Sequence, residues 1–249
     1  MSKMIHSKGA ALIFAQAMLL TFFACRPAES QEIPQSLYSE MKWRMIGPFR
    51  AGKVNGVSGV AGNPATYYMG ADGGSVWKTT DGGVTWKPIF DGESTAPIGA
   101  LAVAPSNPKI IYVGTGVNSV FGDISYGNGV YKSTNGGETW QHLGLEDTRH
   151  IGRVLIDPRN PDVVLVAAMG HTYGPNEERG VFRSTDGGRN WRKVLFKDNT
   201  TGAVDLCFQP GNPQVVYATL WHALWKPDLK DQPFEPGSGL YKSKDGGIT

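Results

Sequence analysis

Residues 76–86 read Val76-Trp-Lys-Thr-Thr-Asp-Gly-Gly-Val-Thr-Trp86, and this stretch decides the fold because close copies of it recur along the chain. Each copy joins a strand-forming segment to Asp-Gly-Gly or Asn-Gly-Gly, and the first three copies run on to a tryptophan. A fixed period of about 55 residues is typical of repeat architectures. The copies begin at Val76, Val130, Val181 and Leu240.

A second marker, Asn-Pro, precedes each copy and divides the repeat into strands. A run rich in β-branched and aromatic residues follows each marker, as after Asn107 and Asn212. We expect strand A before the Asn-Pro turn, strand B after it, strand C leading into the Asp-Gly-Gly turn and strand D leaving it. The predicted ranges are 98–104, 151–157 and 203–209 for strand A, and 85–90, 139–143 and 190–196 for strand D.

Four antiparallel strands per repeat predict an all-β fold, because one such unit cannot cover its own apolar faces and must pack against its neighbours. The fold expected is a β-propeller of four-stranded antiparallel blades, with about four blades present. The blades are expected at about 50–91, 92–145, 146–197 and 198–249.

The recurring turn residues are predicted to build the fold. The Asp or Asn side chain accepts backbone N–H bonds, the glycine pair permits positive φ, and the following tryptophan wedges between blades. Calcium binding is the alternative, but each turn offers one carboxylate and no further acidic ligand at loop spacing, so we expect no metal site. These structural residues are Asp81, Trp86, Asn135, Trp140, Asp186, Trp191 and Asp245.

The segment Thr79-Thr-Asp-Gly-Gly-Val-Thr-Trp86 resembles the Asp box, or BNR repeat, of sialidases, xyloglucanases and the sortilin N-terminal propeller. The closest overall resemblance is to exported bacterial sortilin-like Asp-box proteins, which are often labelled glycosyl hydrolases. It runs from Trp43 to Thr249. The resemblance implies the fold more than an activity, because the box occurs in enzymes and in binding proteins alike.

The N-terminus has the pattern of a signal peptide. Two lysines precede the apolar stretch 10–24, which is too short to span a bilayer comfortably. We expect a signal peptide over 1–30, a linker over 31–41 and the propeller over 42–249, exported to the periplasm, the outer membrane or the medium, with no transmembrane span. A lipid anchor on Cys25 is the alternative. Cys207 lies in an apolar strand and is expected to be buried.

The repeat count leaves two architectures open. Trp43-Arg-Met-Ile46 resembles the predicted strand D segment Trp191-Arg-Lys-Val194, so 42–47 is a candidate closing outer strand of a four-bladed ring. A fragment of a larger propeller, with seven or ten blades, is the alternative that we favour, because the last box stops at Thr249, before its tryptophan.

The antiparallel meander separates two faces of the propeller. Successive connections alternate between opposite ends of the strands, so the A–B turns and the Asp boxes share one face while the B–C and D–A loops share the other. The B–C loops of the second to fourth repeats are long and irregular. Long loops on a rigid scaffold commonly carry binding and catalysis, so we expect the site on the B–C and D–A loop face.

Candidate site residues follow from that face. Carboxylates that could act as a catalytic pair, or form ordinary solvated ion pairs, are Asp123, Asp147, Glu177 and Asp228. Side chains that could contact ligand, or simply pack and stabilise their own loops, are Arg50, Arg149, His150, His171, Arg179, Trp221 and Trp225. Tyr126 and Tyr173 lie in the same B–C loops and face the same choice.

Charge and motif content narrow the classes of function that this chain could have. The formal net charge of +2 and the absence of basic runs argue against a nucleic-acid partner, and no nucleotide or cofactor fingerprint occurs. We rank first a sortilin-like propeller that binds a peptide, a protein or a glycan on the loop face or in the central channel. A glycoside hydrolase acting on a polysaccharide through two loop-face carboxylates comes second, and a structural or assembly propeller third.

Overall fold

The computed structural model describes residues 34, 36, 39, 52–119, 124–224 and 236–249. The chain divides into two compact units, Met1–Phe49 and Arg50–Thr249, and the fold described below is that of the second unit. The predicted signal peptide, the anchor on Cys25 and the closing strand 42–47 lie outside the described residues.

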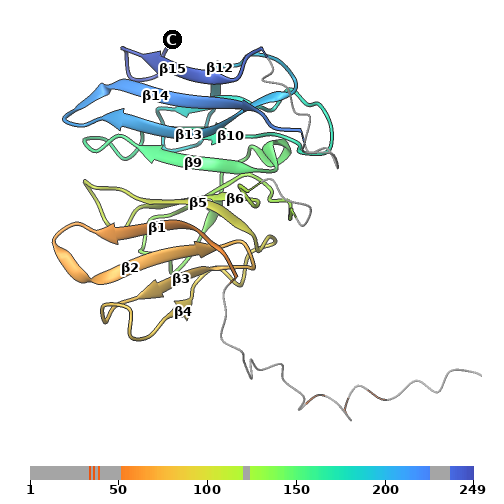
Figure 1. The fold of residues 1–249 in the computed structure, drawn as a ribbon. Helices are drawn as coiled ribbons and strands as arrows, with labels where there is room; N and C mark the ends of the chain where they lie inside the picture. The colour runs from red at the N-terminus through yellow and green to blue at the C-terminus, as the bar shows by residue number, and fades with distance from the viewer. Residues whose placement is uncertain (1–33, 35, 37–38, 40–51, 120–123, 225–235) are drawn as a thin grey trace, which may run out of the picture. The chain divides into compact units, whose positions relative to one another are not determined.

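Four antiparallel sheets follow one another in chain order and form the blades (Figure 1). Three sheets have four strands and the last has three described strands, each with its strands in sequence order. This arrangement confirms the predicted all-β propeller architecture. The strands are β1 (Val54–Val60), β2 (Asn63–Ala71), β3 (Val76–Thr79) and β4 (Lys87–Pro88); β5 (Ile98–Val103), β6 (Ile111–Thr115), β7 (Val130–Ser133) and β8 (Gln141–His142); β9 (Ile151–Ile156), β10 (Val164–Ala168), β11 (Gly180–Ser184) and β12 (Arg192–Leu195); β13 (Thr201–Gln209), β14 (Asn212–His222) and β15 (Gly239–Ser243).

Each junction between successive blades holds its own apolar core. Tyr68 and Val76 of the first blade pack with Ile98 and Ile111 of the second, and similar clusters join the second blade to the third and the third to the fourth. The strands A (β1, β5, β9 and β13) follow one another from blade to blade. Their approach is close at Gly152, where a Cβ atom would lie 2.2 Å from the Val204 carbonyl oxygen.

The Asp-box turns repeat one hydrogen-bond pattern. In the third box the Ser184 hydroxyl donates to Asp186 at 2.8 Å and accepts from the Gly188 N–H, while Asp186 accepts the Asn190 N–H at 3.0 Å. In the first box, hydrogen bonds from the Thr85 side chain and backbone hold the pKa of Asp81 well below its usual range. The carboxylates are therefore used within the turn, as the predicted structural role requires.

One backbone bond repeated in every blade fixes which turns share a face. The first glycine of each box donates its N–H to a carbonyl in the A–B turn, or in the first residues of strand B beside it, in the same blade. The Asp boxes and the A–B turns therefore lie at one end of the strands, and the B–C and D–A loops lie at the other, as predicted. The pairs are Gly82 with Ala65, Gly136 with Lys109, Gly187 with Asp162, and Gly246 with Gln214.

The box tryptophans link one blade to the next. Trp140 Nε1 donates to the Ile89 carbonyl at 2.7 Å, and Trp191 Nε1 donates to the Leu143 carbonyl at 2.8 Å, in each case in the preceding blade. Trp86, in the first blade, instead bonds the Gly83 carbonyl of its own turn at 3.1 Å. The predicted wedge role is thus seen at two junctions.

Three local predictions were wrong. Strand D is shorter than expected: β4 and β8 have only two residues each, because the box turn and its tryptophan take up the first part of the predicted strand. Asn63 and Asn212 begin β2 and β14 rather than lying in a turn before them. Cys207 is exposed, although its neighbours along β13 are apolar.

Candidate functional site

The loop face of the second and third blades gathers chemically active side chains. Asp147 lies in a short 3-10 helix, Glu146–Thr148, in the D–A loop before β9. His171 lies in the B–C loop between β10 and β11, and its Nε2 is 2.7 Å from Asp147 Oδ1. Arg149 Nε is 3.6 Å from the same oxygen. The carboxylate of Asp147 thus lies between two basic side chains, Arg149 from the D–A loop and His171 from the B–C loop.

Two tyrosines flank this group. The guanidinium carbon of Arg149 lies 4.8 Å from the ring centre of Tyr126, which comes from the B–C loop of the second blade. The Tyr173 ring meets Tyr126 edge-on, with the ring centres 6.2 Å apart. Tyr126 is 43% exposed and Tyr173 is 49% exposed. Exposed aromatic rings beside polar groups are suited to contact the apolar faces of sugar rings.

The group Tyr126, Asp147, Arg149, His171 and Tyr173 is called the loop-face cluster below. The sequence pointed to Asp147, Arg149 and His171 as candidates, and the structure brings these three together. The sequence also assigned Tyr126 and Tyr173 to the irregular B–C loops of this face. The contact between the two rings depends on how loops of two blades fold against each other, which no sequence pattern shows.

His150 is a correction to the expected ligand contacts. Its side chain is fully buried, with Nδ1 2.9 Å from the Val117 carbonyl oxygen, so Nδ1 carries the proton. Nε2 is buried and has no partner among the described residues. Burial lowers the pKa of His150 to about 4, so the ring is neutral at pH 7. His150 lies beneath the cluster, 5.3 Å from the Tyr126 ring centre, and does not face solvent.

Arg179 is also a correction, because it holds the loop rather than facing a ligand. The side chain is fully buried, and its guanidinium donates to backbone carbonyls on both sides of the B–C loop of the third blade. Burial lowers its pKa to about 10, which leaves it charged at neutral pH. The accepting carbonyls are those of Met169, His171, Gly174 and Thr200.

The other predicted carboxylate in this region stands apart. Glu177 is exposed, and its carboxylate makes no hydrogen bond or ion pair with another described residue. Glu178 instead pairs with Lys193 at 3.7 Å. Sequence analysis missed Asp72, which forms the loop-face turn of the first blade; its Oδ1 accepts the Lys53 N–H at 2.8 Å. The Asp-Gly-Gly sequence at this turn indicated a structural role, so Asp72 was not considered as a site residue.

Trp221 lies at the loop-face end of β14 and is 37% exposed. Across the described residues, no hydrogen bond, ion pair or ring contact joins it to the loop-face cluster. The candidates Arg50, Asp123, Trp225 and Asp228 fall outside the described residues.

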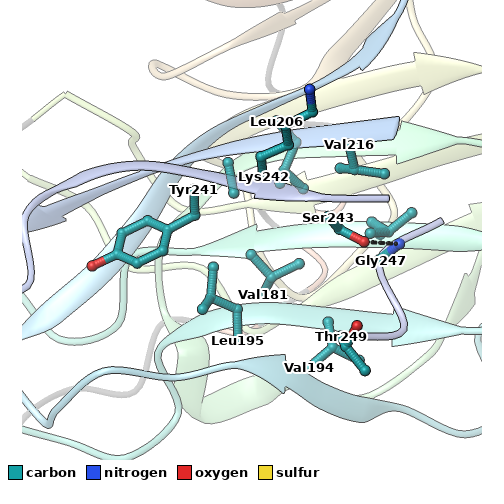
Figure 2. A pocket seen from close by; sticks show the side chains of 12 residues that line it. Val181, Val194, Leu195, Leu206, Val216, Tyr241, Lys242, Ser243, Gly247 and Thr249 are labelled. Atoms are coloured by element: carbon teal, nitrogen blue, oxygen red, sulfur yellow. Dashed lines mark hydrogen bonds between the residues drawn. The ribbon is translucent and has the colours of Figure 1, made fainter. Parts of the chain in front are cut away.

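An apolar groove lies between the third and fourth blades, away from the loop-face cluster (Figure 2). It is lined by Val194 of the third blade and Gly247 of the fourth, among others. At the two preceding junctions the corresponding residues surround Trp140 and Trp191: a Cβ on Gly137 or Gly188 would lie 3.5 or 3.3 Å from the indole. The groove therefore belongs to the packing of blades rather than to a ligand site.

Two further structural features concern metal ligands and membrane-spanning helices. Within the described ranges, no three His, Cys, Asp or Glu side chains are grouped as metal ligands would be. None of the helices in those ranges is long and apolar enough to cross a bilayer.

Comparison with known proteins shows which sequences and folds this chain resembles. A family model described as BNR/Asp-box repeat matches residues 131–142. A xyloglucanase from Paenibacillus sp. is 23% identical over 264 aligned residues, which cover 94% of this chain and 24% of that protein. The chain thus spans about a quarter of the length of this relative.

Solved structures show the same fold. The crystal structure of an ancestral GH74 enzyme is 26% identical, with a TM-score of 0.57, and covers 73% of this chain and 23% of that chain. The GH74 xyloglucanase from Xanthomonas campestris is 22% identical, with a TM-score of 0.57, and covers 80% of this chain and 30% of that chain. The latter likeness bears on the fold alone.

These comparisons change the order of the functional hypotheses. They give no support to the sortilin-like binding protein that sequence analysis ranked first, and they favour its hydrolase alternative. The chain carries Asp-box repeats and has a β-propeller fold like that of GH74 glycoside hydrolases.

Proposed function

We propose that this propeller acts on a polysaccharide of the xyloglucan type, as a glycoside hydrolase, at its loop face. One observation carries the proposal: in a chain aligned over 94% of its length with a xyloglucanase, the carboxylate of Asp147 belongs to one loop-face cluster with the exposed rings of Tyr126 and Tyr173. Cleavage of a sugar chain uses carboxyl groups, and exposed rings suit the sugar that has to be held beside them.

The chemistry assigns Asp147 an acceptor role. Glycoside hydrolysis uses two carboxyl groups, about 5 Å apart for retention and about 6.5–9.5 Å apart for inversion. Asp147 accepts a hydrogen bond from His171 and faces Arg149, so it suits the base or nucleophile rather than the proton donor. Asp72 and Glu177 are the described loop-face carboxyl groups that we propose as partners, beside Asp123 and Asp228 from sequence.

Removing the Asp147 carboxylate tests this assignment. Release of reducing sugar from xyloglucan, cellulose and starch is measured for the full chain and for D147N, D72N and E177Q. We expect activity on xyloglucan and at least about a 100-fold lower rate for D147N. E138Q is the matched control, because Glu138 is an exposed carboxyl in the Asp-box turn at the opposite face. An unchanged melting temperature shows that D147N is folded.

The outcomes separate the hypotheses. Sugar release that D147N and E138Q leave equally unchanged rules out Asp147. No release from any polysaccharide, together with saturable binding of an unrelated peptide, returns the binding hypothesis to first place. Action on a polysaccharide also agrees with the export that residues 1–30 predict, and we keep export as part of the proposal.

A further inference from the structure

Arg149 is held in an unusual backbone conformation at the centre of the loop-face cluster. Its φ is 55°, a value that side chains other than glycine rarely adopt and that costs on the order of 1 kcal/mol or more. The Arg149 carbonyl accepts the Gly127 N–H at 2.8 Å, and this bond from the neighbouring blade helps to fix the conformation. The backbone therefore places the Arg149 side chain over Tyr126.

The Arg149 guanidinium is held in place, but part of its hydrogen-bonding capacity is unused among the described residues. It lies 4.8 Å from the Tyr126 ring centre, and Nε faces Asp147 at 3.6 Å. No described residue accepts a hydrogen bond from its two terminal nitrogens, and the side chain is 39% exposed. Two other exposed arginines of the described part are paired more closely: the Arg159 guanidinium makes two bonds to Asp157, and Arg153 bonds Asp205 at 2.5 Å.

Basic side chains lie close to this guanidinium. Arg179 is buried in the B–C loop of the third blade, and His171, from that same loop, contacts the Asp147 carboxylate that also faces Arg149. Burial chiefly lowers the pKa of His150, and the neighbouring basic side chains His171, Arg149 and Arg179 lower it further, so these three side chains lie near one place. Within the described ranges, Asp147 pairs with Arg149 through Nε alone, so the terminal nitrogens of Arg149 stay open to an added carboxylate.

We propose that Arg149 binds the carboxylate of an acidic sugar, a uronic acid unit, within the polysaccharide that the loop face takes. A planar guanidinium with two free terminal N–H groups matches a carboxylate in a bidentate pair, and stacking on Tyr126 keeps its plane fixed. The free carboxylate oxygen of Asp147 then accepts from a sugar hydroxyl beside it. This inference rests on the proposed function of the same site, and it names the chemical class of substrate.

A matched pair of oligosaccharides tests the inference. Binding of cellohexaose and of the β-1,4-linked glucuronic acid hexamer to the full chain is measured by titration calorimetry at low and high salt. The two probes share a backbone and differ in the carboxylate at C6. We expect the acidic hexamer to bind about tenfold more tightly at low salt, with the preference reduced at high salt.

Variants show whether Arg149 is the cause. R149Q is expected to bring the ratio of the two affinities close to one, and R149K to leave a smaller preference, because a lysine keeps the charge but loses the planar pair. R153Q is the matched control: Arg153 is also exposed, at 47% of its side chain, but is paired with Asp205, so the ratio stays as in the parent protein.

Each result is decisive. Equal affinity for the two hexamers, or a preference that R149Q leaves intact, overturns the inference. The inference can fail while the proposed function stands, if xyloglucan is cleaved and the acidic hexamer is not preferred. The proposed function fails while the inference stands, if the Arg149-dependent preference is found and no polysaccharide is cleaved.

Discussion

Asp147 and His171 are 24 residues apart in the sequence, and their side chains meet at 2.7 Å on the loop face of the third blade. One comes from the D–A loop and the other from the B–C loop, so the contact exists only because strands β9 and β10 bring both loops to the same end of the sheet. Asn176 reinforces it: its side chain donates to the Asp147 carbonyl, and its Oδ1 accepts the His171 N–H.

Arg179 is expected to be the structural support of this contact. R179M leaves the carbonyls of the buried loop without a donor, and we expect it to lower the free energy of unfolding by about 3 kcal/mol. Urea denaturation measures the loss, and limited proteolysis shows whether cleavage begins within 169–176. R159Q, which removes an exposed arginine bound to Asp157, is expected to cost much less, because solvent screens an exposed ion pair. Equal losses in the two variants contradict the supporting role.

Trp191 and Trp86 occupy the same position in their boxes but make different contacts. Trp191 bonds the preceding blade at Leu143, whereas Trp86 bonds its own turn at Gly83. W191A should therefore cost about 3 kcal/mol of unfolding free energy, and W86A clearly less, since only the first removes packing between described blades. The measurement is denaturant unfolding of both variants. A W86A loss as large as that of W191A contradicts the wedge account.

His150 predicts a pH dependence of stability. Its pKa is about 4 in the folded chain against an ordinary value of 6.5, so the unfolded chain takes up the proton first as the pH falls. The stabilisation is complete above pH 6.5 and is lost between pH 6.5 and 4, by up to about 3 kcal/mol. H150N, with an uncharged donor for the Val117 carbonyl, should lose less over this range.

The informative result is the difference between the stability-against-pH curves of the parent protein and H150N. Hydrogen bonding from Arg159 lowers the pKa of Asp157, so this carboxyl also loses stabilisation when it is protonated on further acidification. That loss is common to the parent protein and H150N. Parallel stability curves between pH 6.5 and 4 would show that His150 is not the titrating group.

The sequence was sufficient to predict the blades and the two faces of the propeller, because both follow from short repeated motifs. The Asp boxes and Asn-Pro markers recur in each repeat, and an antiparallel meander then fixes which connections share an end. The length of strand D was overestimated because the pattern around Trp86 and Trp140 looks β-forming, while pairing starts only after the tryptophan.

Side-chain exposure in the loops could not be predicted in the same way. His150 and Arg179 are polar residues in irregular segments, where exposure is the usual expectation, and both are fully buried. Their burial arises from contacts with Val117 of another blade and with carbonyls across a loop, and neither contact leaves a periodic signal. Cys207 shows the converse case, an apolar-looking strand position that is exposed.

The central claim is that a sugar chain is held on the B–C and D–A loop face, opposite the Asp boxes. Hydrogen–deuterium exchange of the full chain, with and without a xyloglucan oligosaccharide, tests it most directly. The account predicts slower exchange at 145–152 and 169–176, with the box turns 133–139 and 184–190 unchanged. Slower exchange confined to the box turns, or to the groove beside Val194, would contradict it.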